Sequence, residues 1–232
     1  MLIFFTRILL VFLIPVTIFS QENIVSTDSV TQKQKYGLRI GLDVNKLVNS
    51  SISNNYDGFE LNADYRISNK LYIASEIGLI NNTEDEEYLN FTTKGTYIKS
   101  GIDYNMYTNW LDMQNMIFAG FRIGYSDFDQ IINNYTIYDT NNQIWGQSFI
   151  NTPINNKDLS SLWVELIIGV KAEIFNNLFL GFNLEVKKMI NSEIKNNIQN
   201  MYVPGFNKTF EGSSFGVGFG YKLSYLIPIV KK

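Results

Sequence analysis

The feature that most constrains this chain is an alternation of apolar and polar side chains with a period of two residues. Between residues 36 and 44, apolar side chains occupy every even position, whereas glycine, Arg39 and Asp43 occupy the odd ones. Successive side chains of a β-strand point to opposite faces, so this pattern predicts a strand with one apolar and one polar face. Seven similar segments follow, at residues 59–67, 71–81, 98–106, 117–126, 162–174, 178–187 and 215–225.

The connections between these segments alternate in length. Short links at residues 68–70, 107–114 and 175–177 separate longer polar stretches at 46–55, 82–94, 127–158 and 189–211. Short periplasmic turns and long extracellular loops are typical of membrane barrels. No stretch after the first twenty residues has 18 uninterrupted apolar residues, which excludes membrane-spanning helices there. The sequence predicts an all-β protein, an eight-stranded antiparallel up-and-down transmembrane β-barrel over residues 35–232.

The N-terminus has the features of a secretory signal peptide. Arg7 precedes an apolar run at residues 8–19, and Ser20 offers a small residue at a cleavage point. An uncleaved anchor is the alternative, but about a dozen apolar residues is short for a span of roughly 20. We therefore expect cleavage of residues 1–20, a flexible periplasmic lead-in at residues 21–34, and export to the outer membrane.

Two residue types are missing from the sequence. The chain has neither Cys nor His, which excludes Ser–His and Cys–His catalysis and any zinc site built on histidine. The net charge of −3 gives no sign of nucleic-acid binding, which usually needs a basic face. We expect no enzymatic activity, no cofactor and no bound metal.

Alternation alone does not say which face points inward, because a soluble lipocalin-like barrel would bury the apolar face. The membrane interpretation is favoured by the glycine-rich polar face, which suits a narrow lumen, and by the almost purely apolar faces of the last two segments. Aromatic residues near the ends of apolar faces also match an interfacial girdle. These are Tyr36, Tyr65, Tyr104, Tyr125, Trp163 and Tyr225.

An inward polar face would gather charges of both signs in a narrow lumen. The predicted set comprises Arg39, Asp43, Glu60, Asp64, Arg66, Glu76, Lys99, Asp103, Arg122, Glu165, Lys171, Glu173, Glu185, Lys187 and Lys222. Buried lone charges are costly, so these groups must pair or be hydrated. We interpret them as a structural ion network that plugs the barrel; a small ion or proton path is the alternative.

The predicted outer loops contain aromatic and acidic residues. Aromatic side chains there could anchor a partner or a glycan, or could equally cap the barrel mouth. The candidates are Tyr135, Tyr138, Trp145, Phe149, Tyr202 and Phe206. The acidic run at residues 84–87 could hold a divalent cation, but its spacing matches no calcium loop, and a solvated run is the simpler interpretation. Asp127 and Asp129 open the third loop without a pattern that indicates acid–base chemistry.

Several segments resemble an uncharacterised outer-membrane barrel family of Bacteroidota. They are residues 58–66 (GFELNADYR), 88–95 (YLNFTTKG), 176–182 (NNLFLGF) and 216–221 (GVGFGY), and the resemblance extends from Tyr36 to the C-terminus. It implies compartment and fold and transfers no site residues. The architecture is also similar to small OmpA-type barrels, which by itself indicates little about function. The tail after Tyr225 departs from barrels that end on an aromatic strand residue.

The sequence thus predicts an outer-membrane barrel with a plugged polar lumen and a structural or adhesive role. Its expected partners are outer-membrane lipid and lipopolysaccharide, with any extracellular partner at the loops unidentified. A small pore or transporter is the main alternative. A membrane-embedded enzyme and a soluble lipocalin-like ligand binder are weaker ones.

Overall fold

The computed structural model describes residues 35–108, 114–137 and 148–231. The predicted signal peptide, the predicted lead-in, Tyr138 and Trp145 lie outside these residues. In the part of the chain that is described, no helix is long and apolar enough to cross a membrane.

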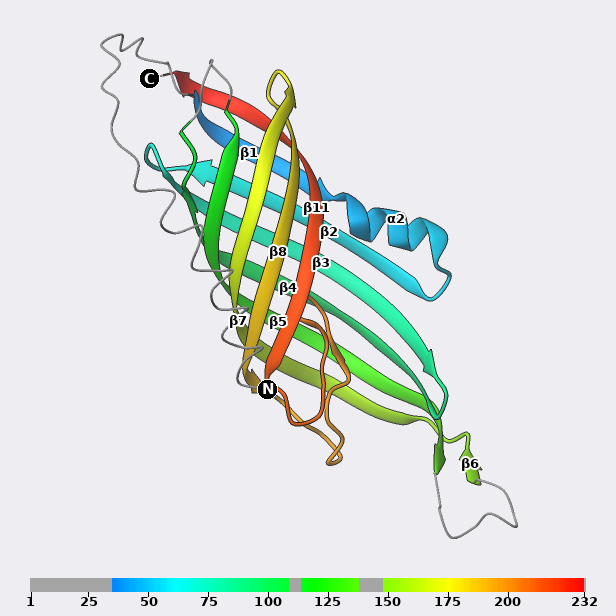
Figure 1. The fold of residues 1–232 in the computed structure, drawn as a ribbon. Helices are drawn as coiled ribbons and strands as arrows, with labels where there is room; N and C mark the ends of the chain where they lie inside the picture. The colour runs from blue at the N-terminus through cyan, green and yellow to red at the C-terminus, as the bar shows by residue number, and fades with distance from the viewer. Residues whose placement is uncertain (1–34, 109–113, 138–147, 232) are drawn as a thin grey trace, which may run out of the picture. The chain divides into compact units, whose positions relative to one another are not determined.

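Eight long strands form a closed antiparallel ring (Figure 1). Each strand pairs with its neighbour along the chain, and the last pairs with the first. They are β1 (Lys35–Asp43), β2 (Tyr56–Arg66), β3 (Leu71–Glu86), β4 (Leu89–Asn105), β5 (Met116–Ile137), β7 (Ile154–Phe175), β8 (Leu178–Ser192) and β11 (Phe215–Lys231). The predicted eight-stranded up-and-down barrel is confirmed.

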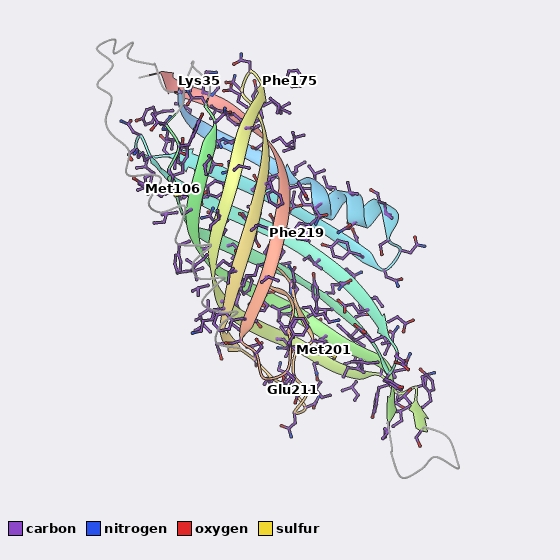
Figure 2. The ribbon with its side chains drawn as sticks, viewed as in Figure 1. Lys35, Met106, Phe175, Met201, Glu211 and Phe219 are labelled. Atoms are coloured by element: carbon purple, nitrogen blue, oxygen red, sulfur yellow. The ribbon has the colours of Figure 1, made fainter. Side chains whose placement is uncertain are left out.

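Four smaller elements complete the fold. The helix α2 (Val44–Ile52) follows β1, and β6 (Ser148–Ile150) pairs with the end of β5. A small hairpin of β9 (Tyr202–Val203) and β10 (Asn207–Lys208) lies in the connection between β8 and β11. Figure 2 shows Lys35 and Phe175 at one end of the barrel, with Met201 and Glu211 at the other. We call these the turn end and the loop end.

The predicted connection at residues 46–55 does join β1 to β2, but most of it forms the helix α2, which the sequence pattern did not predict. Asp43 caps α2, its Oδ1 accepting a hydrogen bond from the backbone N–H of Lys46 at 3.1 Å. An aspartate in this position satisfies a backbone donor that has no partner within the helix. Apolar residues at Val44, Leu47 and Val48 then follow the spacing of one helical face.

The predicted loops at residues 82–94 and 127–158 are wrong in their extent. β3 and β4 run on until only Glu87 and Tyr88 separate them, and β5 and β7 are 22 residues each. In the added strand the buried apolar residues, such as Phe91, Phe128 and Leu159, lie on the inward face, so the alternation with apolar residues outward does not continue into it. Hydrogen bonds join its side chains across the strands, as between the hydroxyls of Thr83 and Thr92 at 2.9 Å.

The charged face of the barrel points inward and the apolar face outward. Glu165 is fully buried on β7, whereas its neighbour Leu166 is 63% exposed, and Val217 on β11 is 76% exposed. Apolar surface on this scale, wrapped around a closed ring, is the surface that lipid solvates. The soluble lipocalin-like interpretation, which requires the apolar face inside, is therefore wrong.

The aromatic residues predicted for the girdle do not all lie on the outer face. Tyr65, Tyr104, Tyr125 and Tyr225 are exposed on the outer face. Trp163, which we placed with them, is buried inside the barrel instead.

Candidate functional site

All fifteen charged residues predicted for the lumen lie on the inward face. They are buried except for Lys171 and Glu173, which are partly exposed. Strand pairing explains why they meet, since Glu76 lies directly opposite Lys99 and Glu165 directly opposite Lys187. Because every second side chain of a strand points inward, such pairs recur at regular intervals and form layers along the lumen.

The central layer is organised around Lys99. Its Nζ lies 2.5 Å from a carboxylate oxygen of Glu76. Three further carboxylates surround the same ammonium at 3.7–3.9 Å: Glu60, Glu165 and Glu185. One cation is thus shared by four glutamates contributed by four strands, β2, β3, β7 and β8.

Three other lysines balance these carboxylates. Lys222 lies 2.5 Å from Glu76, Lys187 lies 2.9 Å from Glu185, and Lys46 on α2 reaches Glu60 at 2.6 Å. We call the four lysines and four glutamates the central cluster. Its charges cancel, which is what a low-dielectric interior requires of buried ions.

A second layer lies toward the turn end. Arg122 contacts Asp103 at 2.6 Å, and Lys171 contacts Asp64 at 2.7 Å. Arg39 lies 3.7 Å from Asp64, and its guanidinium stacks 4.3 Å from the ring centre of Phe179. Between this layer and the central cluster is a cavity of about 20 Å³, which has room for an ordered water.

Backbone groups close the turn end. Arg66 donates to the carbonyls of Ser68 and Asn69 at 3.1 and 2.6 Å. The carboxylate of Glu173 accepts hydrogen bonds from the backbone of Gln114 and Asn177, each at 2.9 Å. These contacts hold the short turns against the lumen.

An apolar layer covers the central cluster at the loop end. We call it the outer plug; its buried members are Ile80, Phe91, Tyr97, Phe128, Leu159, Trp163, Tyr202, Val203 and Phe206. Two members also reach down into the central cluster. The indole N–H of Trp163 donates to Glu165 at 2.7 Å, and the Tyr97 hydroxyl donates to Glu60.

Two predicted loop contact residues belong to this plug. Tyr202 is 6% exposed and Phe206 is 2% exposed, so these two cap the barrel mouth, one of the two roles considered for the loop aromatics, and offer no surface to a partner. The β9–β10 hairpin folds back into the mouth, where Phe206 packs edge-on against Trp163 with ring centres 6.1 Å apart. Burial also raises the pKa of Tyr202, because its phenolate would be poorly solvated there.

The other loop candidates that the structure describes are Tyr135 and Phe149. Tyr135 is partly exposed on β5, and Phe149 on β6 is 63% exposed. Lys208 of β10 lies 2.6 Å from Glu86 and 3.6 Å from Glu84, and its hydrogen bond with Glu86 raises the pKa of Lys208. Within the described residues, no group of three or more carboxylates is placed to hold a metal ion.

Lys46, Lys35 and Tyr97 also belong to the interior, although the sequence pattern did not predict them there. Lys35 lies 3.7 Å from Glu173. The inward position of Tyr97 and Trp163 could have been predicted, because each lies two residues from a predicted lumen residue on the same strand. Tyr97 precedes Lys99, and Trp163 precedes Glu165. The position of Lys46 could not have been predicted in this way, since it depends on the helix α2.

No curated protein matches the sequence. Two solved structures are similar to the barrel. One is Ail, the attachment invasion locus protein of Yersinia pestis, with 9% identity and a TM-score of 0.41 over 83% of this chain and 97% of that one. The other is Neisserial surface protein A, with 12% identity and a TM-score of 0.39 over 82% of this chain and 94% of that one. A family model matches residues 1–232 in full, and the chain therefore belongs to the family described as a domain of unknown function, DUF6048.

Proposed function

We propose that this protein is an outer-membrane barrel that does not conduct and that serves as a rigid support for a contact surface at its loop end. The observation that carries the proposal is the filled interior. Two layers of paired charges occupy the lumen, and the outer plug lies over them. This arrangement supports a structural or adhesive role over a pore.

An ion crossing this lumen would have to separate buried ion pairs. Breaking such a pair costs about 3–5 kcal/mol when one charge is left without compensation. Lys99 alone is shared by four carboxylates, so its displacement would weaken the charge compensation of all four together. The lumen is thus held closed by its own side chains.

The strands that extend beyond the apolar band support the adhesive part of the proposal. On β5 the regular run of outward apolar residues ends at Tyr125, while the strand continues to Ile137. Twelve residues of strand measure about 40 Å. The resulting projection carries exposed Tyr88 and Phe149 at its loops and edge, the kind of aromatic side chain that anchors partners.

Compartment and closure are tested together by fractionation and electrophoresis. We expect the protein in the outer-membrane fraction, with an unheated band that migrates differently from the boiled one, because closed barrels resist SDS until heated. A soluble protein without a band shift would contradict the membrane placement.

Conductance separates the closed barrel from the pore. We expect planar bilayers that contain the heat-modifiable protein to stay silent across physiological voltages, because the central cluster and the outer plug block the lumen. A porin reconstituted in parallel is the positive control. Regular, voltage-independent conductance steps from this protein alone would overturn the proposal in favour of a small pore.

A further inference from the structure

The ring of strands is complete only on the side of the turn end. β1 pairs with β11 from Lys35 to Asp43, whose partner is Lys222, and there β1 ends. On its other side β11 stays paired with β8 as far as Phe215. Within the described part of the chain, Phe215–Tyr221 of β11 therefore has no strand partner on the side toward β1. In Figure 1, β2 and β11 diverge beyond the end of β1, and α2 continues alongside β2.

The helix α2 covers the edge of β2 but does not replace the missing strand against β11. Ser50 of α2 exchanges hydrogen bonds with both backbone groups of Gly58 on β2, at 2.7 and 3.0 Å. A helix satisfies its own backbone groups and cannot continue a strand ladder. The edge of β11 is left facing α2 across an opening in the barrel wall.

A pocket of about 480 Å³ occupies this opening, within the range of roughly 300–1,000 Å³ typical of ligand pockets. Its lining joins two environments. Leu184, Val217 and Phe219 belong to the outward apolar face, whereas Lys99, Glu185 and Lys187 belong to the central cluster. The pocket thus connects the apolar exterior with the charged interior.

Glycines keep the β11 side of this opening free of side chains. Gly216, Gly218 and Gly220 occupy the inward positions of β11 along the unpaired stretch. A Cβ at Gly218 would lie 3.0 Å from Glu185 and Lys187, and one at Gly220 would lie 2.9 Å from Asn183. Larger residues at these positions would fill the opening from within.

We propose that this lateral opening binds the headgroup and upper acyl chain of a zwitterionic glycerophospholipid from the surrounding bilayer. The position of the opening, among outward apolar side chains, selects a ligand that arrives through the membrane. Its lining carries both signs: three lysines, Lys46, Lys99 and Lys187, and two carboxylates, Asp43 and Glu185. This mixture suits a headgroup with a phosphate and an ammonium. The lining carries only one lysine more than it has carboxylates, too small an excess to balance a strongly anionic, many-chained lipid with several phosphates.

The unpaired edge gives a second reason for an occupant. Backbone N–H and C=O groups at membrane depth are costly when they have no partner. A lipid phosphate and its ester oxygens can accept hydrogen bonds from that edge. This inference rests on the membrane placement proposed above, but not on the absence of conductance.

The test is native mass spectrometry of the detergent-purified full chain after incubation with phosphatidylethanolamine. We expect one retained lipid per barrel. Asn49→Trp should abolish retention, because Asn49 lines the pocket from the exposed face of α2. The matched control is Ser51→Trp on the same helix, where the exposed Ser51 does not line this pocket; it should retain lipid like the wild type.

Both variants are checked for the heat-dependent band shift before use. No retained lipid in the wild type, or equal retention in both tryptophan variants, would overturn the inference. Retention of phosphatidylglycerol or lipopolysaccharide in preference to phosphatidylethanolamine would overturn the choice of a zwitterionic headgroup. Loss of the band shift in the wild type would contradict the barrel's membrane placement itself, a failure that is distinct from an empty opening.

Discussion

Replacing Lys99 with methionine is expected to destabilise the barrel by about 3–5 kcal/mol, the usual effect of removing one partner from a buried ion pair. Methionine has nearly the length of the lysine stem, so packing changes little. The ammonium, however, is shared by Glu60, Glu76, Glu165 and Glu185. Its loss leaves four carboxylates with three lysines in a buried layer. Urea titration of the folded band in lipid vesicles measures the change.

Two further variants show whether charge balance is the cause. Adding Glu76→Gln to Lys99→Met restores three carboxylates to three lysines, and we expect it to recover part of the lost stability. Lys208→Ala removes a lysine whose pair with Glu86 is about half exposed on both sides, and should cost less than about 1 kcal/mol. If Lys99→Met unfolds like the wild type, the central cluster is hydrated and does not hold the barrel closed.

The sequence predicted those features of the fold that follow from the alternation of side chains between the two faces of a strand. Alternation places Lys99, Asp103 and Arg122 on one face whatever the register, and the closed ring then brings them together. The identity of each pair was not predictable, because it depends on the register between strands. Glu76 meets Lys99 directly, whereas the contact from Lys222 to Glu76 crosses the lumen.

Three features could not be read from apolar patterns. In the upper halves of β5 and β7 apolar residues are few, and the buried ones, such as Phe128 and Leu159, lie on the inward face, so the alternation seen in the rest of these strands does not continue there. The helix α2 is only nine residues, too short for its period to stand out between two strands. The burial of Tyr202 and Phe206 depends on a hairpin that folds back over the mouth, a contact with β4 and β7 that is distant in the sequence.

That hairpin is expected to come off the barrel mouth when Gly205 is replaced by alanine. Gly205 has φ +82°, a conformation that costs an L-residue about 1–2 kcal/mol. A Cβ there would also lie 2.7 Å from the ring of Tyr97 and 3.0 Å from Trp163, and such overpacking typically costs about 1–3 kcal/mol more. Limited trypsin digestion of the folded, heat-shiftable protein should then cleave at Lys208, which wild-type protein resists.

The connection between β8 and β11 contains its own control. Gly212 has φ +74°, but a Cβ there would meet nothing within 4 Å. Gly212→Ala therefore carries the backbone cost without the clash, and should leave Lys208 as protected as in the wild type. Cleavage at Lys208 in both variants alike would mean that the backbone cost alone, and not the clash with Tyr97 and Trp163, releases the hairpin.

The same two variants also test which layer, the outer plug or the central cluster, blocks the lumen. The outer plug and the central cluster both block it, and Gly205→Ala removes only the first. We expect the trypsin-sensitive variant to remain silent in planar bilayers, because Lys99 and its four carboxylates lie beneath the plug and stay paired. Conductance in Gly205→Ala, with a silent Gly212→Ala, would instead make the β9–β10 hairpin a gate over an otherwise open path.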